Sequence, residues 1–81
     1  MIYGLYVIFD KIAVEGSPIF EAKTDGVAQR SYSGLLAKEG IFSDEYDLIH
    51  VGTIDKETNI VTSSEHRIIK ANLKMETTDD E

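Results

Sequence analysis

The chain has 81 residues, no cysteine and a formal net charge of −7, and 42% of its residues are apolar. This length fits one small domain, and the lack of cysteine excludes both a disulfide framework and a thiolate metal site. The acidic balance has the wrong sign for a general polyanion binder, but four of the fifteen acidic residues fall at positions 76–81, which leaves eight basic residues against eleven acidic ones elsewhere.

The first segment, IYGLYVIF at residues 2–9, has apolar side chains at both odd and even positions. This pattern is typical of a central strand covered on two faces. If only one face of this strand meets the core, we expect the other face to meet a partner. Residues 10–17 include Gly16 and are predicted to form the loop of a hairpin, and a half-buried strand is predicted from Pro18 to Lys23.

A helix is predicted to follow directly. Thr24 is a good N-cap, Asp25 suits the positive end of the helix dipole, and Gly40 is a natural stop. Gly34 inside the helix costs about 1 kcal/mol relative to alanine, and close packing would explain its presence. The apolar residues that recur at helical spacing are Val27, Ala28, Tyr32, Leu35 and Leu36.

Residues 46–54 are predicted to form the next strand, with Leu48 and Ile54 on one side and Ile49 and Val51 on the other. The turn cluster at 55–59 leads into Ile60 and Val61, which indicates a second hairpin. Beyond residue 64 an alternating pattern favours a strand, and a short helix capped by Ser64 is the alternative.

These elements predict an α+β domain over residues 1–75. Its mainly antiparallel sheet would have four or five strands in ββαββ order, with one helix packed on it. The acidic residues 76–81 are predicted to be a disordered tail.

The sequence gives little support to catalysis or metal binding. His50 and His66 fall in different elements without a second ligand pair, and the acidic cluster of Asp44, Glu45 and Asp47 is typical of a solvated loop. We therefore expect no enzymatic activity, metal or cofactor. The apolar start of the chain is too short to span a bilayer and lacks the features of a signal peptide, so we expect a soluble intracellular protein without membrane contact.

Two cations stand out as candidates for nucleic-acid binding. Lys23 ends the second predicted strand and Arg30 falls in the second helical turn, so both could flank one edge of the sheet. Tyr6, Lys11 and Arg67 are further candidates, because proteins that bind single strands combine a basic groove with aromatic rings on which bases stack. The alternative is that these residues are solvated charges and core tyrosines.

The order of four short segments resembles a known family. The segments are YVIFDK at 6–11, PIFEAKTD at 18–25, AQRSY at 28–32 and YDLIHVGTIDKETNIV at 46–61. Together they resemble the small nonstructural protein of microviruses, in the gokushovirus branch, which is usually described as a DNA-binding or single-strand-synthesis protein. The chain departs from that pattern at Asn59, where a Thr-Gly pair is common, and residues 62–81 match no part of it.

The resemblance implies a protein made in the host cytoplasm during phage infection and absent from the particle. It would bind single-stranded DNA and assist viral genome synthesis or packaging. The alternative function is a homo-oligomeric adaptor, such as a homodimer, that contacts a host replication or capsid protein without binding nucleic acid. The acidic surface and the doubly apolar first strand favour that alternative.

Overall fold

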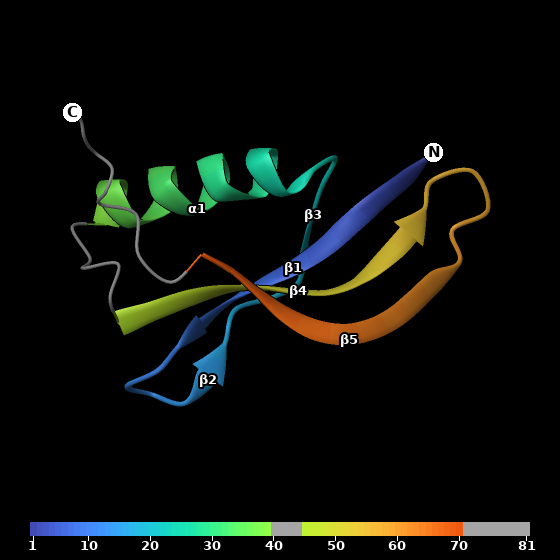
Figure 1. Cartoon of the computed structure of the whole chain (residues 1–81). Coiled ribbons are helices and arrows are strands. Elements are labelled where there is room, and N and C mark those ends of the chain that lie inside the picture. Colours follow the sequence, from blue (N-terminus) through green and yellow to red (C-terminus); the bar gives the residue numbers. More distant parts are fainter. Residues whose placement is uncertain (40–44, 71–81) are drawn as a thin grey trace.

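The computed structural model describes residues 1–39 and 45–70. It contains a five-stranded antiparallel sheet with one helix packed on it (Figure 1), which confirms the predicted α+β class. The predicted tail at 76–81 lies outside the described residues. In chain order the elements are β1 (Ile2–Asp10), β2 (Glu15–Gly16), β3 (Phe20–Ala22), α1 (Asp25–Glu39), β4 (Tyr46–Asp55) and β5 (Val61–Lys70).

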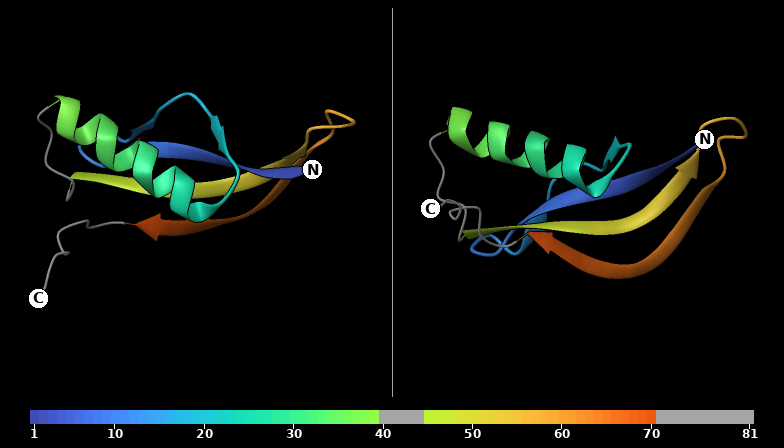
Figure 2. Two further views of the ribbon diagram at one scale, coloured as in Figure 1. Left: turned by 90° about the horizontal axis from the view of Figure 1, so that it is seen from above. Right: turned by 45° about the horizontal axis from the view of Figure 1, so that its top comes forward.

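Strand β1 is central, as predicted. The sheet order is β2-β1-β4-β5, and β3 also pairs with β1. Helix α1 lies across one face of this sheet in every view (Figures 1 and 2). Among the described residues, no element lies over the other face of β1. The sequence predicted that both faces of this strand would be covered, but the described part of the structure covers only one.

The hydrophobic core lies between α1 and the sheet. Ala28, Tyr32 and Leu36 recur every four residues along α1 and are buried there. Val27 and Leu35 remain 38% and 43% exposed, so the buried stripe of the helix is narrower than the sequence predicted. The sheet contributes the buried residues Tyr6, Ile8, Ala22 and Leu48, and the partly buried residues Phe20, Tyr46 and Ile69 pack against them.

Local signals fix where α1 and the second hairpin begin. Oγ1 of Thr24 accepts a hydrogen bond from the Val27 amide at 3.2 Å, which confirms Thr24 as the N-cap. In the turn after β4, the Asn59 amide donates to the Asp55 carbonyl at 2.7 Å, and Asn59 adopts a positive φ of 64°.

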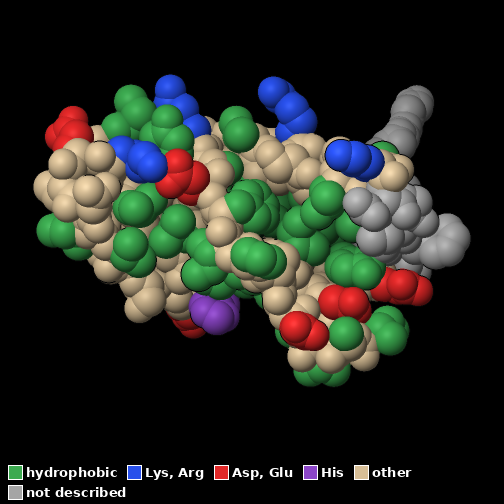
Figure 3. Space-filling view, turned by 180° about the vertical axis from the view of Figure 1, so that it is seen from behind, with side chains coloured by type: hydrophobic (Ala, Val, Ile, Leu, Met, Phe, Trp, Pro, Cys, Tyr) green, Lys and Arg blue, Asp and Glu red, His purple; other side chains and the backbone are tan. Residues whose placement is uncertain are grey.

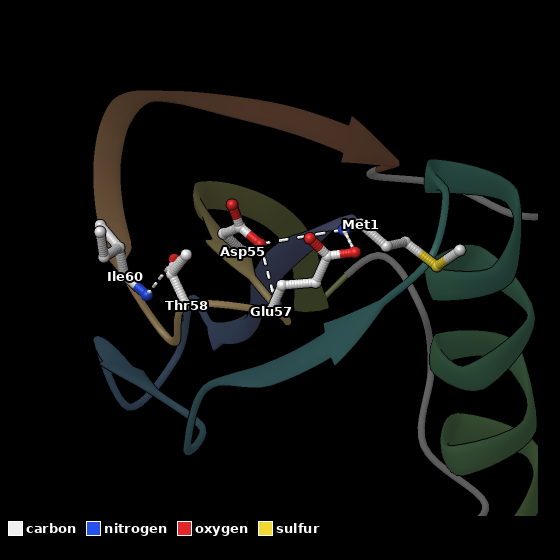
Figure 4. A network of polar contacts seen from close by, with 5 residues as sticks. All are labelled: Met1, Asp55, Glu57, Thr58 and Ile60. Carbon is white, nitrogen blue, oxygen red and sulfur yellow. Dashed lines mark hydrogen bonds and ion pairs between the residues drawn. The ribbon is translucent and has the colours of Figure 1, made fainter.

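The N-terminus is held at the same turn by ion pairs. The N-terminal ammonium lies 3.8 Å from Asp55 Oδ1 and 3.6 Å from Glu57 Oε2 (Figure 4).

Strand β5 extends to Lys70, which confirms the strand and contradicts the short helix capped by Ser64. The predicted division of side chains in β4 is also wrong. Tyr6 pairs with His50 but Leu5 pairs with Gly52, so a bulge at this point puts Ile54 opposite Tyr3 rather than on the side of Leu48.

Gly52 is required where β4 and β5 approach each other. A Cβ at this position would lie 2.5 Å from the carbonyl oxygen of Thr62. The backbone of β5 can therefore pass this closely only because the side chain is absent.

Candidate nucleic-acid interface

The two cations that lead the sequence prediction are both exposed. Lys23 lies in the bend between β3 and α1, and Arg30 lies in the helix. Arg30 comes two residues after Ala28 and two before Tyr32, both of which face the core. At about 100° per residue, Arg30 therefore points away from the sheet. It lies on the outer face of α1, and the prediction that it flanks a sheet edge is wrong.

The other two predicted cations are engaged in ion pairs. Nζ of Lys11 lies 3.6 Å from Oδ1 of Asp47, and Nη1 of Arg67 donates to Oδ2 of Asp25 at 3.0 Å. Arg67 thereby links the end of β5 to the start of α1. A contact with a phosphate would compete with these internal carboxylates, so neither cation is freely available.

Tyr6 is unavailable for stacking because it is part of the core. Its side chain is 1% exposed, and its ring packs against Phe20 with centroids 5.8 Å apart and edge-on against His50 at 5.2 Å. Its hydroxyl donates to Oδ1 of Asp25 at 2.6 Å. A nucleic-acid base could reach this ring only if α1 left the sheet.

The same contacts shift two pKa values. Burial, and then the hydrogen bond to Asp25, raise the pKa of Tyr6 to about 12. The hydrogen bonds from Tyr6 and Arg67 hold the pKa of the Asp25 carboxyl below its ordinary value. Tyr6, Asp25 and Arg67 therefore form a junction that joins β1, α1 and β5.

Lys38 is an exposed cation, which is what the predicted binding site required, although the sequence analysis did not include Lys38 in that site. Among the Lys and Arg side chains that the structure describes, Lys11, Lys56 and Arg67 make ion pairs, whereas Lys23, Arg30 and Lys38 make none. All three unpaired cations belong to α1 or its approach. Figure 3 shows Lys and Arg side chains along the helix, at the top of that view, with hydrophobic side chains below.

The outer face of α1 has no described carboxylate to oppose these cations. Asp25 turns inward to Tyr6 and Arg67, and the exposed positions between the cations carry uncharged residues, most of them small, with Val27 and Leu35 as the exceptions. One of the small residues is Gly34, and a Cβ built there would meet nothing within 4 Å. Close packing within the chain therefore does not explain Gly34, contrary to the sequence prediction. The exposed residues opposite the buried stripe of α1 are Gly26, Val27, Arg30, Ser31, Gly34, Ala37 and Lys38, with Lys23 just before the helix.

The acidic cluster of Asp44, Glu45 and Asp47 was predicted to be a solvated loop, but Asp47 is a buried residue of a strand. Asp47 belongs to β4 and is 8% exposed, and its Oδ1 is buried without a hydrogen-bond partner. Glu45 is exposed, and Asp44 lies outside the described residues. Within residues 1–39 and 45–70, no group of three or more His, Asp or Glu side chains could hold a metal ion. No helix in the same ranges is long and apolar enough to cross a membrane.

A family model described as Phage ORF5 protein matches residues 3–74. The chain belongs to this family. The match makes it a phage protein, as the resemblance implied, and extends the similarity past residue 61, where the four sequence segments ended. Comparisons with curated proteins and with solved structures give no significant match.

Proposed function

We propose that this phage ORF5-family protein is an accessory protein that binds single-stranded DNA through the outer face of α1. It would assist the synthesis or packaging of a microvirus genome, in the gokushovirus branch that the sequence resembles. The observation that carries the proposal is the gathering of Lys23, Arg30 and Lys38, unpaired and without an opposing described carboxylate, in a chain of net charge −7.

The mechanism is electrostatic. Cations that neutralise phosphates release condensed counterions, so the affinity falls as the salt concentration rises. Three phosphate contacts to a single strand correspond to a slope of about −2 in log K against log salt, or a loss of roughly twentyfold between 50 and 200 mM. The small residues Gly34 and Ala37 between Arg30 and Lys38 allow the sugar-phosphate backbone to approach this part of the helix closely.

Base stacking contributes little to this mode of binding. Tyr6 and Tyr32 are buried in the core, and α1 presents no aromatic side chain on its outer face. Binding should therefore be nearly independent of base sequence, with dissociation constants in the range of about 10⁻⁴ to 10⁻⁶ M that is typical of non-specific contacts.

Fluorescence anisotropy of a labelled single-stranded oligonucleotide at 50 and 200 mM salt tests the proposal. The Arg30→Ala/Lys38→Ala variant removes two unpaired cations, and Lys11→Ala/Lys56→Ala removes two paired ones, so both variants change the net charge equally. We expect the first variant to weaken binding about tenfold or more and to reduce the salt slope by about 1.4, and the second to change both quantities much less.

Two results would contradict the proposal. Equal weakening in both variants would show that net charge, rather than the α1 face, governs binding. No binding by the wild type at 50 mM salt would remove the DNA-binding function and leave the adaptor that contacts a host replication or capsid protein.

A further inference from the structure

The helix-free face of the sheet carries an aligned apolar row. Tyr6 and Ile8 of β1 face the helix, so Val7 between them points to the other side. Val7 pairs with Ile49 of β4, and Ile49 pairs with Ile68 of β5. Directly paired residues project to the same face, so these three side chains form a row across three strands.

More apolar residues extend this row along the sheet. Phe9 lies two residues from Val7 on the same side of β1, and Tyr3 pairs with Ile54 of β4. Leu5 also lies on this side of β1, but it is only 9% exposed. Ile68, at the outer strand, is 59% exposed. We call the set of Tyr3, Val7, Phe9, Ile49, Ile54 and Ile68 the open sheet face.

Charged groups near this face are neutralised in pairs. Asp47, opposite Phe9, lies 3.6 Å from Nζ of Lys11, and Glu21, opposite Leu5, lies 2.7 Å from Nζ of Lys56. Lys56 also lies over the ring of Tyr3, 5.6 Å from its centroid. The open sheet face is therefore an apolar centre between two internal ion pairs, without a net charge from these groups.

We propose that a second copy of this chain covers the open sheet face, packing sheet against sheet about a two-fold axis. Two chains of net charge −7 repel each other, and this repulsion is smallest where the facing surfaces are neutral. A two-fold contact sets the same apolar patch against itself, so one surface supplies both sides of the interface. A small domain also gains stability by burying such a face.

The size of the face is consistent with a weak dimer. Three strands about 4.8 Å apart, followed from Tyr3 to Phe9 at about 3.3 Å per residue, outline a patch of about 14 by 20 Å. This outline encloses about 280 Å², which even with side-chain relief is less than the roughly 800 Å² per partner of a standard interface and falls in the range of weak contacts. Dimerisation should therefore depend on concentration, and it should strengthen somewhat as added salt screens the repulsion between the two acidic chains.

Analytical ultracentrifugation of the DNA-free protein between about 5 and 500 µM tests the dimer independently of the proposed function. Ile68→Glu places a carboxylate in the interface, and Ile60→Glu makes the same change at a residue of similar exposure, 61%, in the turn before β5. We expect Ile68→Glu to raise the dimer dissociation constant about a hundredfold and Ile60→Glu to leave it unchanged. Circular dichroism would confirm that both variants fold.

A wild type that remains monomeric at 500 µM would overturn the proposal. So would a dimer that both variants weaken equally, because the contact would then lie elsewhere. If Ile68→Glu fails to fold, Ile68→Ala provides the same test with an expected weakening of about tenfold, and an unchanged dissociation constant would overturn the proposal.

Discussion

Replacing Gly34 with alanine is expected to stabilise the folded protein. Glycine inside a helix costs about 1 kcal/mol relative to alanine, because it loses more backbone freedom on folding. At Gly34 nothing offsets this cost, since an added Cβ would meet no atom within 4 Å. The gain in the free energy of unfolding should be about 0.5 to 1 kcal/mol.

Urea and thermal unfolding followed by circular dichroism measure this gain. For a domain of this size, 1 kcal/mol corresponds to a rise of about 4 to 8 °C in Tm. The matched control is Gly52→Ala, whose Cβ would lie 2.5 Å from the Thr62 carbonyl oxygen and should destabilise the fold by about 1 to 3 kcal/mol. A Gly34→Ala variant that is neutral or less stable than the wild type would refute the reasoning.

Three further predictions concern buried and paired groups. Because the pKa of Tyr6 is raised to about 12, the stability contributed by its protonated hydroxyl is complete below pH 10 and is lost as the pH rises from 10 to 12. The stability advantage of the wild type over Tyr6→Phe should therefore shrink across that window in urea unfolding, and a constant difference would contradict this. The Asp25 pKa is lowered, so its stabilisation is present above about pH 4 and is lost on acidification, and Asp25→Asn should be less stable than the wild type at pH 7 but approach it near pH 3. Lys11→Ala should destabilise the fold by about 1 kcal/mol by leaving the buried Asp47 carboxylate without its ion pair, and adding Asp47→Asn should recover most of that loss; additive losses in the double variant would exclude the coupling.

Much of the fold is predictable because its signals act over a few residues. The capping oxygen of Thr24 starts α1, the cluster at 55–59 closes the second hairpin, and the apolar pattern of residues 2–9 marks the central strand. These signals depend on backbone geometry and on neighbours within one turn or hairpin. They predicted the α+β class and the position of α1 without tertiary information.

The surroundings of the candidate site residues were not predictable from the sequence, because exposure and pairing depend on distant partners. Tyr6 is a plausible stacking ring in the sequence, but α1 buries it and Asp25 binds its hydroxyl. Lys11 and Arg67 count as free cations until the fold places Asp47 and Asp25 beside them. Lys38 becomes a candidate for phosphate contact only when the structure shows that Lys11 and Arg67 form ion pairs.

The sequence by itself determined the type and order of most elements, through hydrophobic period, helix capping and turn residues. The exception is β2, which lies at Glu15–Gly16 within the segment predicted as a loop and pairs with the end of β1. Only the tertiary structure decided which face of each element is covered. Arg67 and Asp25 are 42 residues apart, and the bulge near His50 changes which side chains of β4 share a face. Strand register and helix placement result from many weak long-range contacts together, so no local pattern encodes the unpaired cations of α1 or the open sheet face.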